Sequence, residues 1–337
     1  MCRQIIYTGW FILSCLLWLL AAIAGELPES TATPFAQGDI FVAATVMDDP
    51  DDDHAGTGRI LQYDADLNLK GTLWVEGTRH KIGGLTFDSD GVLWGFAQLT
   101  PAILQFAPDA KQLPVSKWSD RSFSSVAFAP DGNLYFGEHL AGTSTSAGPN
   151  LTTSFRLLPG RDVVGDGWVF KYSRAGKELE HYATDYHPAP PFLAITSIVL
   201  SADGKRLIYI SENGNRIMQY DLENDKQLPD LAVLAKDSGV PMVLVMVAFP
   251  DGRLLISTNL GFIIVDPDSG EVLDQRELGG MGWAAIAPSI DNEHVIVGNF
   301  FNGNIIKYRL SDGEVVAQNS INEKFSLSGV AQFAGMD

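Results

Sequence analysis

The chain has 337 residues, of which 46% are hydrophobic and 19% charged, so it can bury a large core and does not belong to the disordered class. Its formal net charge is −18, with no stripe of Arg and Lys to offset it, which argues against nucleic acid as a partner. The sequence contains no Walker or dinucleotide glycine signature, no His-Glu-x-x-His motif and no Gly-x-Ser-x-Gly elbow, which disfavours nucleotide and serine-hydrolase chemistry.

The N-terminal segment has the pattern of a secretory signal peptide. Arg3 is the only charged residue before Glu26, residues 10–23 are almost wholly apolar, and Ala22 and Ala24 provide a small-residue cleavage site. We therefore predict that residues 1–24 are removed and that the mature protein is secreted or periplasmic, with no membrane attachment. An uncleaved membrane anchor or lipoprotein processing is the alternative.

Both cysteines, Cys2 and Cys15, lie in this segment. The mature chain would then contain no disulfide, zinc–thiolate site or cysteine nucleophile, and packing alone would stabilise it. Residues 25–37 are rich in Pro, Ser, Thr and Ala and are predicted to be a linker.

The rest of the chain repeats one phrase, a short β-rich run, an Asp-Gly or Asp-Asn turn, and a second β-rich run, which predicts a hairpin. The copies span residues 84–94, 126–135, 198–209, 247–256 and 285–297. Their turn aspartates are Asp90, Asp131, Asp203, Asp251 and Asp291. Most of the intervals match a propeller blade of about 40 to 50 residues. The interval after Asp131 is longer, and we assign its excess, residues 139–167, to a loop inserted within a blade.

A second phrase, an apolar strand that often ends in Tyr-Asp, predicts the third strand of each repeat. It spans residues 59–64, 102–106, 168–172, 216–221, 262–266 and 304–308. A more polar fourth strand follows most copies, as in 71–75 and 271–274. Four strands per repeat is the composition of a propeller blade.

The two ends of the repeat region predict how the ring closes. The region opens at 39–43 with a second strand that lacks its first, and a first strand without a hairpin stands at 328–333. We therefore predict an all-β fold for residues 38–337: a six-bladed β-propeller of four-stranded blades, closed by pairing of the C-terminal strand into the N-terminal blade. We expect it to be a monomer.

These phrases resemble the propeller superfamily that holds NHL-repeat proteins, senescence-marker-protein/gluconolactonase proteins and strictosidine-synthase-like proteins. The closest stretch, residues 201–212, is similar to their S-x-D-G-K-x-L-Y-x-A-D/E blade start. This architecture hosts lactonases, lyases, synthases and binding modules, so the resemblance implies a fold more specifically than a reaction.

Aligning the second strands predicts which side chains reach one mouth of the central channel: Ala44, Ala97, Glu138, Glu212, Thr258 and Asn299. Glu138, Glu212 and Asn299 have hard oxygen ligands, suited to Ca²⁺ or another divalent cation. The resemblance also implies that an acidic residue at the Glu212 position is a metal ligand. A cation there could activate water or polarise a carbonyl.

The sequence departs from the gluconolactonase-like pattern, which places an Asn before the Gly of a first strand. The matching positions hold Gly83, Ser124, Thr196, Leu244 and Ser328. The alternative interpretation is that Glu138, Glu212 and Asn299 solvate the mouth or cap loop backbone.

His139, next to Glu138, is the histidine predicted to lie at the mouth, although an ordinary loop histidine is the alternative. We predict Glu138, His139 and Glu212 as catalytic candidates, with acid/base roles for the carboxylates and the imidazole. The leading hypothesis is metal-assisted hydrolysis of a small lactone or ester at the mouth. The alternatives are a non-catalytic propeller that binds a ligand or protein there, and a lyase resembling the streptogramin-inactivating propellers.

Overall fold

A computed structural model describes residues 27–49, 52–78, 81–97, 100–146, 154–187, 193–234 and 242–336, apart from the side chains of 52–55. The predicted signal peptide, residues 1–24, and the start of the predicted linker lie outside the described residues. In the described part of the chain all regular structure is β-strand, and no helix is long and apolar enough to cross a membrane.

The predicted turns form as the Asp-Gly and Asp-Asn pairs require. Gly91, Gly132, Gly204, Gly252 and Asn292 all have positive φ angles, between 58° and 91°, a region that Gly and Asn enter most easily. In four of these turns the aspartate Oδ1 also accepts the backbone N–H two residues later, as Asp131 does from Asn133. This local chemistry fixes the hairpin in each repeat.

Apart from one separate two-stranded sheet, the strands of the described residues form six antiparallel sheets, which we number as blades from the N-terminus. Blade 1 contains β26 (Gly329–Gln332), β1 (Ile40–Asp49), β2 (Asp52–Tyr63) and β3 (Leu69–Trp74). Blade 2 contains β4 (Ile82–Phe87), β5 (Leu93–Ala97) and β6 (Ala102–Phe106). Blade 3 contains β7 (Phe123–Phe128), β8 (Leu134–Glu138), β11 (Val169–Tyr172) and β12 (Glu178–Tyr182). Blade 4 contains β13 (Ser197–Leu200), β14 (Arg206–Ile210), β15 (Arg216–Asp221), β16 (Lys226–Gln227) and β17 (Ala232–Val233). Blade 5 contains β18 (Val243–Ala248), β19 (Leu254–Thr258), β20 (Gly261–Val265) and β21 (Val272–Glu277), and blade 6 contains β22 (Trp283–Pro288), β23 (His294–Asn299), β24 (Asn304–Arg309) and β25 (Val315–Ser320).

Blade 2 takes its fourth position from an irregular segment. Ser116 bridges to Ile103 and Gln112 bridges to Phe106, so residues 112–116 run along the outer side of β6. The four-layer pattern is therefore kept in this blade without a regular outer strand.

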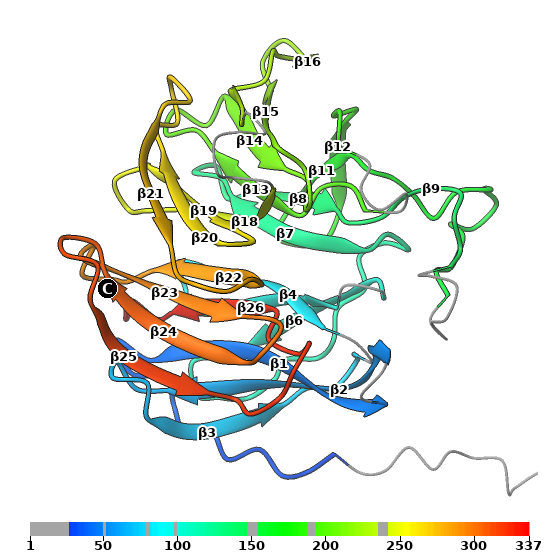
Figure 1. The fold of residues 1–337 in the computed structure, drawn as a ribbon. Helices are drawn as coiled ribbons and strands as arrows, with labels where there is room; N and C mark the ends of the chain where they lie inside the picture. The colour runs from blue at the N-terminus through cyan, green and yellow to red at the C-terminus, as the bar shows by residue number, and fades with distance from the viewer. Residues whose placement is uncertain are drawn as a thin grey trace, which may run out of the picture.

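The innermost strands of the six blades form a closed ring. Each of β26, β4, β7, β13, β18 and β22 contacts the next, and β22 returns to β26 (Figure 1). The ring closes inside blade 1, where β26 pairs antiparallel with β1 in the register Ile40–Gln332 to Ala43–Gly329. The fold is a six-bladed β-propeller. The predicted number of blades and the predicted closure by the C-terminal strand are both confirmed.

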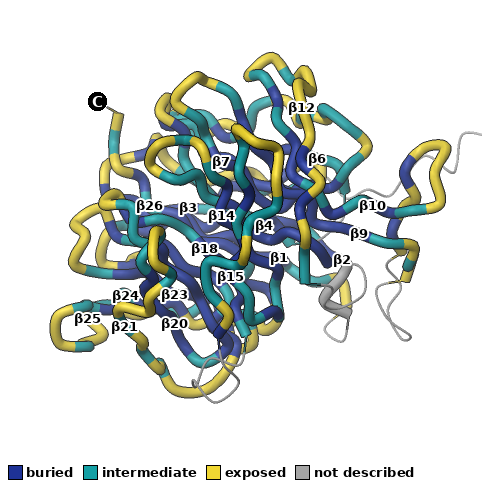
Figure 2. Tube along the Cα trace, turned by 90° about the horizontal axis from the view of Figure 1, so that it is seen from above, coloured by how far each residue is buried: buried dark blue, intermediate teal, exposed yellow. Residues whose placement is uncertain are grey.

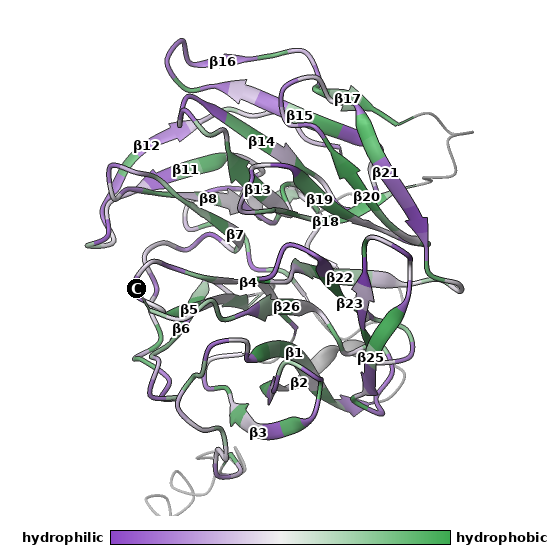
Figure 3. Cartoon of the chain, turned by 90° about the vertical axis from the view of Figure 1, so that its left-hand side faces the viewer, coloured by the Kyte–Doolittle hydropathy of each residue, from purple (hydrophilic) through white to green (hydrophobic). Residues whose placement is uncertain are grey.

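Six buried apolar clusters lie at the six interfaces between neighbouring blades. The second strands β5, β8 and β19 are buried along their whole length because both of their faces pack against other blades. Outer strands such as β12 are mostly exposed and hydrophilic (Figures 2 and 3). Stability therefore comes from blade-to-blade contact, as expected for a chain without disulfides in its folded part.

The predicted linker contacts the propeller over much of its described length. Thr31 donates its backbone N–H to the Thr72 carbonyl on the outer edge of β3, and Thr33 donates to Gln62 Oε1. The Phe35 ring packs 4.5 Å from that of Phe41, between blades 1 and 2. From Ser30 onward this segment covers an edge that would otherwise be open to pairing.

The predicted insertion after β8 is a small excursion from blade 3. It contains two short paired strands, β9 (Ala141–Gly142) and β10 (Gly165–Asp166), and projects from the ring at β9 (Figure 1). Leu140, Phe155, Val164 and Leu193 form a separate apolar cluster beneath it. The insertion is not an additional blade, as predicted.

Candidate functional site

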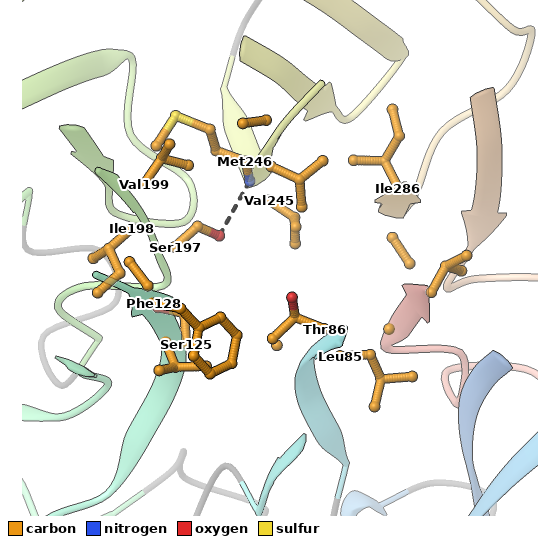
Figure 4. A pocket seen from close by; sticks show the side chains of 18 of the residues that line it. Leu85, Thr86, Ser125, Phe128, Ser197, Ile198, Val199, Val245, Met246 and Ile286 are labelled. Carbon is orange, nitrogen blue, oxygen red and sulfur yellow. Dashed lines mark hydrogen bonds between the residues drawn. The ribbon is translucent and has the colours of Figure 1, made fainter. Parts of the chain in front are cut away.

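The six inner strands surround a cavity of about 340 Å³ at the centre of the ring (Figure 4). Its wall is largely aliphatic, with hydroxyl groups from Thr86, Ser125, Ser197 and Ser328. The Ser125 Oγ is buried and has no hydrogen-bond partner among the described residues. The channel thus offers a few polar groups on an apolar wall, which is the usual character of a small-molecule site.

The hydroxyls at the start of the inner strands hold neighbouring blades together. Ser124 Oγ donates to the Ile195 carbonyl at 2.6 Å, and Ser328 Oγ donates to the Ile82 carbonyl at 3.0 Å. Thr196 Oγ1 contacts the Leu244 carbonyl at 3.5 Å. These are positions where the gluconolactonase-like pattern has Asn, so here they serve ring assembly.

Glu138 lies at the end of β8 and is completely buried. Its Oε1 accepts a hydrogen bond from Arg121 Nη1 at 2.7 Å, and its Oε2 accepts the backbone N–H groups of Asp166 and Gly167 at 2.9 and 2.8 Å. Burial raises the pKa of the Glu138 carboxyl, while the Arg121 guanidinium and the two amides oppose that rise. Both oxygens of this predicted ligand and catalytic candidate are therefore engaged in fixing the base of the insertion.

The Glu138 pair belongs to a larger ionic network. Arg121 Nη2 also contacts Asp166 Oδ2 at 2.9 Å, and Arg161 binds the same carboxylate at 2.6 Å. The two arginines hold the pKa of Asp166 below its usual value against the effect of burial. Each acidic group in this network has a cationic partner, so the network contributes little net negative charge to the mouth.

His139 is 4% exposed, and its backbone is held on both sides. Its N–H donates to the Ser122 carbonyl at 2.8 Å, and its carbonyl accepts the Ala194 N–H at 2.8 Å. The imidazole Nδ1 has no hydrogen-bond partner in the described part of the chain. Burial, helped by the Lys81 charge, lowers the pKa of His139 to about 4, so the ring is neutral at pH 7.

Glu212 follows β14 in blade 4, but the strand register places Ser211 at the position of Glu138, because Ser125 pairs with Gly137 and Ser197 pairs with Ile210. The predicted alignment of the second strands is therefore one residue off in this blade. Burial of its carboxyl raises the pKa of Glu212, and the Lys81 ammonium opposes this effect. Unlike Glu138, it has no arginine acting on its pKa. Its carboxyl is therefore shifted toward the protonated form by its surroundings.

Lys81 is the residue that joins these two groups. It immediately precedes β4 in blade 2, yet its charge acts on His139 from blade 3 and on Glu212 from blade 4. Its Nζ also lies 4.2 Å from the ring centroid of Phe300, which follows β23 in blade 6. Lys81 thus interacts electrostatically with side chains from three other blades.

Asn299, the third predicted ligand, serves as a turn cap. Its Oδ1 accepts the backbone N–H groups of Phe301 and Asn302 at 3.0 and 3.2 Å, and its Nδ2 donates to the Met281 carbonyl at 2.8 Å. This arrangement matches the alternative interpretation that the mouth residues cap loop backbone.

The predicted ligand set does not fit a divalent cation. The Arg121 guanidinium is hydrogen-bonded to the Glu138 carboxylate, and two backbone N–H groups are hydrogen-bonded to Asn299 Oδ1. Of the three predicted ligands, only Glu212 then remains to offer an oxygen to a cation. Within the described ranges no group of three or more His, Cys, Asp or Glu residues could hold a metal ion. Calcium or another divalent cation at the mouth stays a prediction from the sequence.

Sequence reasoning missed Lys81, Arg121 and Phe300. The signal for Lys81 and Arg121 was their place just before an inner strand, because residues entering that strand reach the same mouth as those leaving the second strand. The alignment of the second strands predicts the residues that leave those strands at the mouth, but it does not predict the residues that enter the inner strands there.

Comparison with known proteins supports the fold alone. A chain in the crystal structure of the nidogen/laminin complex superimposes with a TM-score of 0.59 at 11% identity, covering 89% of this chain and 100% of that one. A protein of unknown function from Bacteroides caccae matches with a TM-score of 0.58, 11% identity and the same coverage. No protein-family model and no curated protein matches the sequence. Membership of the NHL-repeat and gluconolactonase-like group therefore stays a prediction from the blade motif.

Proposed function

We propose that this propeller binds a small-molecule ligand at the channel mouth formed by Lys81, His139 and Glu212. The observation that supports this most is the buried His139 Nδ1, which has no hydrogen-bond partner among the described residues. An unpaired buried polar atom costs free energy, about 1–3 kcal/mol, that a ligand or an ordered water recovers.

The three side chains offer complementary contacts to such a ligand. Lys81 supplies a charged donor, the neutral His139 ring supplies a donor and an acceptor, and the Glu212 carboxyl can donate when protonated. Lys81, His139 and Glu212 come from blades 2, 3 and 4. The distances between them are therefore set by the propeller as a whole and not by one flexible loop. Preorganisation of this kind lowers the cost of binding.

Fragment screening with crystals of the mature protein tests the proposal. We expect bound fragments to gather between Lys81, His139 and Glu212, and to disappear in a Glu212→Gln variant tested under the same conditions. Glu271→Gln, an exposed change outside the mouth, is the matched control. Fragments that bind reproducibly elsewhere and leave the mouth empty would contradict the proposal.

Acid/base chemistry is the second candidate, and the opposite pKa shifts of Glu212 and His139 favour it. A protonated Glu212 could donate a proton while the neutral His139 accepts one, which serves metal-independent hydrolysis of a lactone or ester, or elimination by a lyase. Turnover of lactone and ester panels that is lost in both Glu212→Gln and His139→Gln would support it. Activity that persists in both variants would remove it.

We also propose export of the protein as a monomer, on the basis of the N-terminal segment and the covered blade edges. N-terminal sequencing of the exported protein should begin at Gly25, and light scattering should give the mass of one chain. An intact Met1 or a stable dimer would contradict the respective part.

A further inference from the structure

Three phenylalanine rings form an exposed aromatic surface on the rim of the mouth. Phe300 and Phe301 follow β23, and Phe325 precedes β26, so the surface joins blades 6 and 1. Their ring centroids lie 5.7 to 5.8 Å apart. Phe301 is 41% exposed and Phe325 is 39% exposed. We call these three residues the mouth ledge.

The backbone that holds the mouth ledge in place is conformationally strained. Phe325 has a φ angle of 54°, a left-handed conformation that bulky residues rarely adopt. Beside it, Gly282 has a φ angle of 93°, and a Cβ there would lie 2.7 Å from the Phe301 ring. Strained backbone that keeps apolar rings in contact with water points to a functional surface, because folding alone favours burying them.

Lys81 connects the ledge to the polar part of the mouth. Its ammonium lies over the Phe300 ring, and Phe301 and Phe325 are the ring neighbours of Phe300. A flat apolar group resting on Phe301 or Phe325 would therefore lie close to a fixed positive charge.

Two acidic side chains of this region are already paired with arginines, so they repel an anionic ligand less than the acidic composition of the protein suggests. Glu323 of the ledge loop is bound to Arg59 at 2.6 Å, and Glu138 is bound to Arg121. Burial raises the pKa of Glu212, which reduces the negative charge that Glu212 would direct at an anion. A ligand carboxylate would thus meet mostly compensated acidic groups around Lys81.

We propose that the mouth ledge and Lys81 recognise an aromatic carboxylic acid, with its ring packed on Phe301 and Phe325 and its carboxylate paired with Lys81. This inference rests on the proposed function and narrows its ligand class. The aromatic contacts provide area and orientation, and the ammonium provides a charge-assisted hydrogen bond. A cationic aromatic ligand is the main competitor, because aromatic faces also attract cations.

Ligand-observed NMR titration with four probes tests the ligand class. Phenylacetate has both an aromatic ring and a negative charge. Acetate lacks the ring, phenylacetamide lacks the charge, and 2-phenylethylamine has the ring with a positive charge. We expect phenylacetate to bind tightest. Tighter binding of 2-phenylethylamine, equal binding of acetate, or no detectable binding of phenylacetate would overturn the inference.

Two sets of variants assign the contacts. Lys81→Met should weaken phenylacetate about tenfold and phenylacetamide little, because the variant removes a charge-assisted hydrogen bond that phenylacetamide does not make. Phe301→Ala and Phe325→Ala should weaken all three ring-bearing probes and leave acetate unchanged. Leu69→Ala removes an apolar side chain that is 57% exposed, more than Phe301 or Phe325, on β3 away from the inner strands, and is the control.

The outcome separates this inference from the proposed function. Each variant is first checked for a wild-type unfolding transition, so that loss of binding is not loss of fold. Fragments bound at the mouth together with indifference to phenylacetate would overturn the inference alone. A mouth that takes neither fragments nor phenylacetate would overturn both. Phenylacetate binding that is equal in wild type and all ledge variants would place its site elsewhere and overturn the inference.

Discussion

At the scale of single residues, Glu138 shows how a side chain selected for chemistry can serve the fold. The sequence places it at the mouth, and the structure fills both of its oxygens with donors from Arg121 and from the insertion. A buried carboxylate satisfied in this way contributes mainly by compensating the charge of the partly buried Arg121 guanidinium.

We predict that Glu138→Gln destabilises the protein by about 3 kcal/mol, because one partner of a buried ion pair is removed and the other is left behind. Urea unfolding followed by tryptophan fluorescence measures the change. Glu271→Gln, which alters an exposed carboxylate, should leave the midpoint in place. An equally stable Glu138→Gln variant would show that Asp166 alone compensates Arg121.

His139 makes stability depend on pH. Its pKa of about 4 in the folded protein lies below the 6.5 of a free histidine, so between these values the unfolded chain binds more protons. The stabilising contribution of the neutral ring is therefore full above pH 6.5 and is lost as the pH falls toward 4. Glu212, with its raised pKa, has the opposite effect, since its folded form holds the proton more tightly.

We predict that the wild type loses about 2 kcal/mol more than His139→Gln when the pH is lowered from 7 to 5. Comparison with this variant cancels the contribution of Glu212. His181→Gln, which changes an exposed histidine, should follow the wild type. Parallel pH profiles for wild type and His139→Gln would show that the imidazole is protonated inside the fold.

At the scale of the elements, Gly84 in β4 lies against the neighbouring inner strand β7. Its φ angle is 61°, and a Cβ there would overlap the carbonyl oxygen of Ser124 at the start of β7. Gly132, in the turn of blade 3, has a φ angle of 82° but no atom within 4 Å of the same position. The two glycines share a backbone conformation and differ in their surroundings.

We predict that Gly132→Ala costs about 1 kcal/mol, from backbone strain alone. Gly84→Ala should cost at least about 2 kcal/mol more, because the clash separates blades 2 and 3 at the channel. Thermal and urea unfolding of both variants measure the difference. Equal costs would mean that β4 and β7 move apart freely, and would contradict a rigid inner ring.

The elements were predictable from the sequence because their signals are local. Each Asp-Gly turn fixes a hairpin, and the unmatched strands at 39–43 and 328–333 fix the closure. The mouth was predictable in part, since position along a second strand determines which end of the channel a residue reaches. The role of Glu138 was not predictable, because Arg121 and Asp166 approach it from separate loops.

Lys81 and the mouth ledge show the same limit. No local pattern indicates that a lysine before β4 contacts a phenylalanine after β23. Blades 2 and 6 are far apart in the sequence, and only closure of the ring brings these two residues together. The strained φ of Phe325 likewise arises from the path that joins β25 to β26, and a sequence pattern does not reveal it.

At the scale of the whole molecule, the arrangement of blades bears on metal binding. Two of the three predicted ligands, Glu138 and Asn299, are committed to holding loops of blades 3 and 6. We therefore predict that a chelator leaves the melting temperature of the mature protein unchanged and that added calcium does not raise it, because a ligand stabilises the fold only when it binds the folded state. Elemental analysis and differential scanning calorimetry, with and without chelator, make the measurement.

A melting temperature that falls with chelator and recovers with calcium would contradict this prediction. Repeating the scan on Glu212→Gln would then locate the ion. Loss of the calcium response in that variant would place the ion at the mouth, and an unchanged response would place it elsewhere on the propeller.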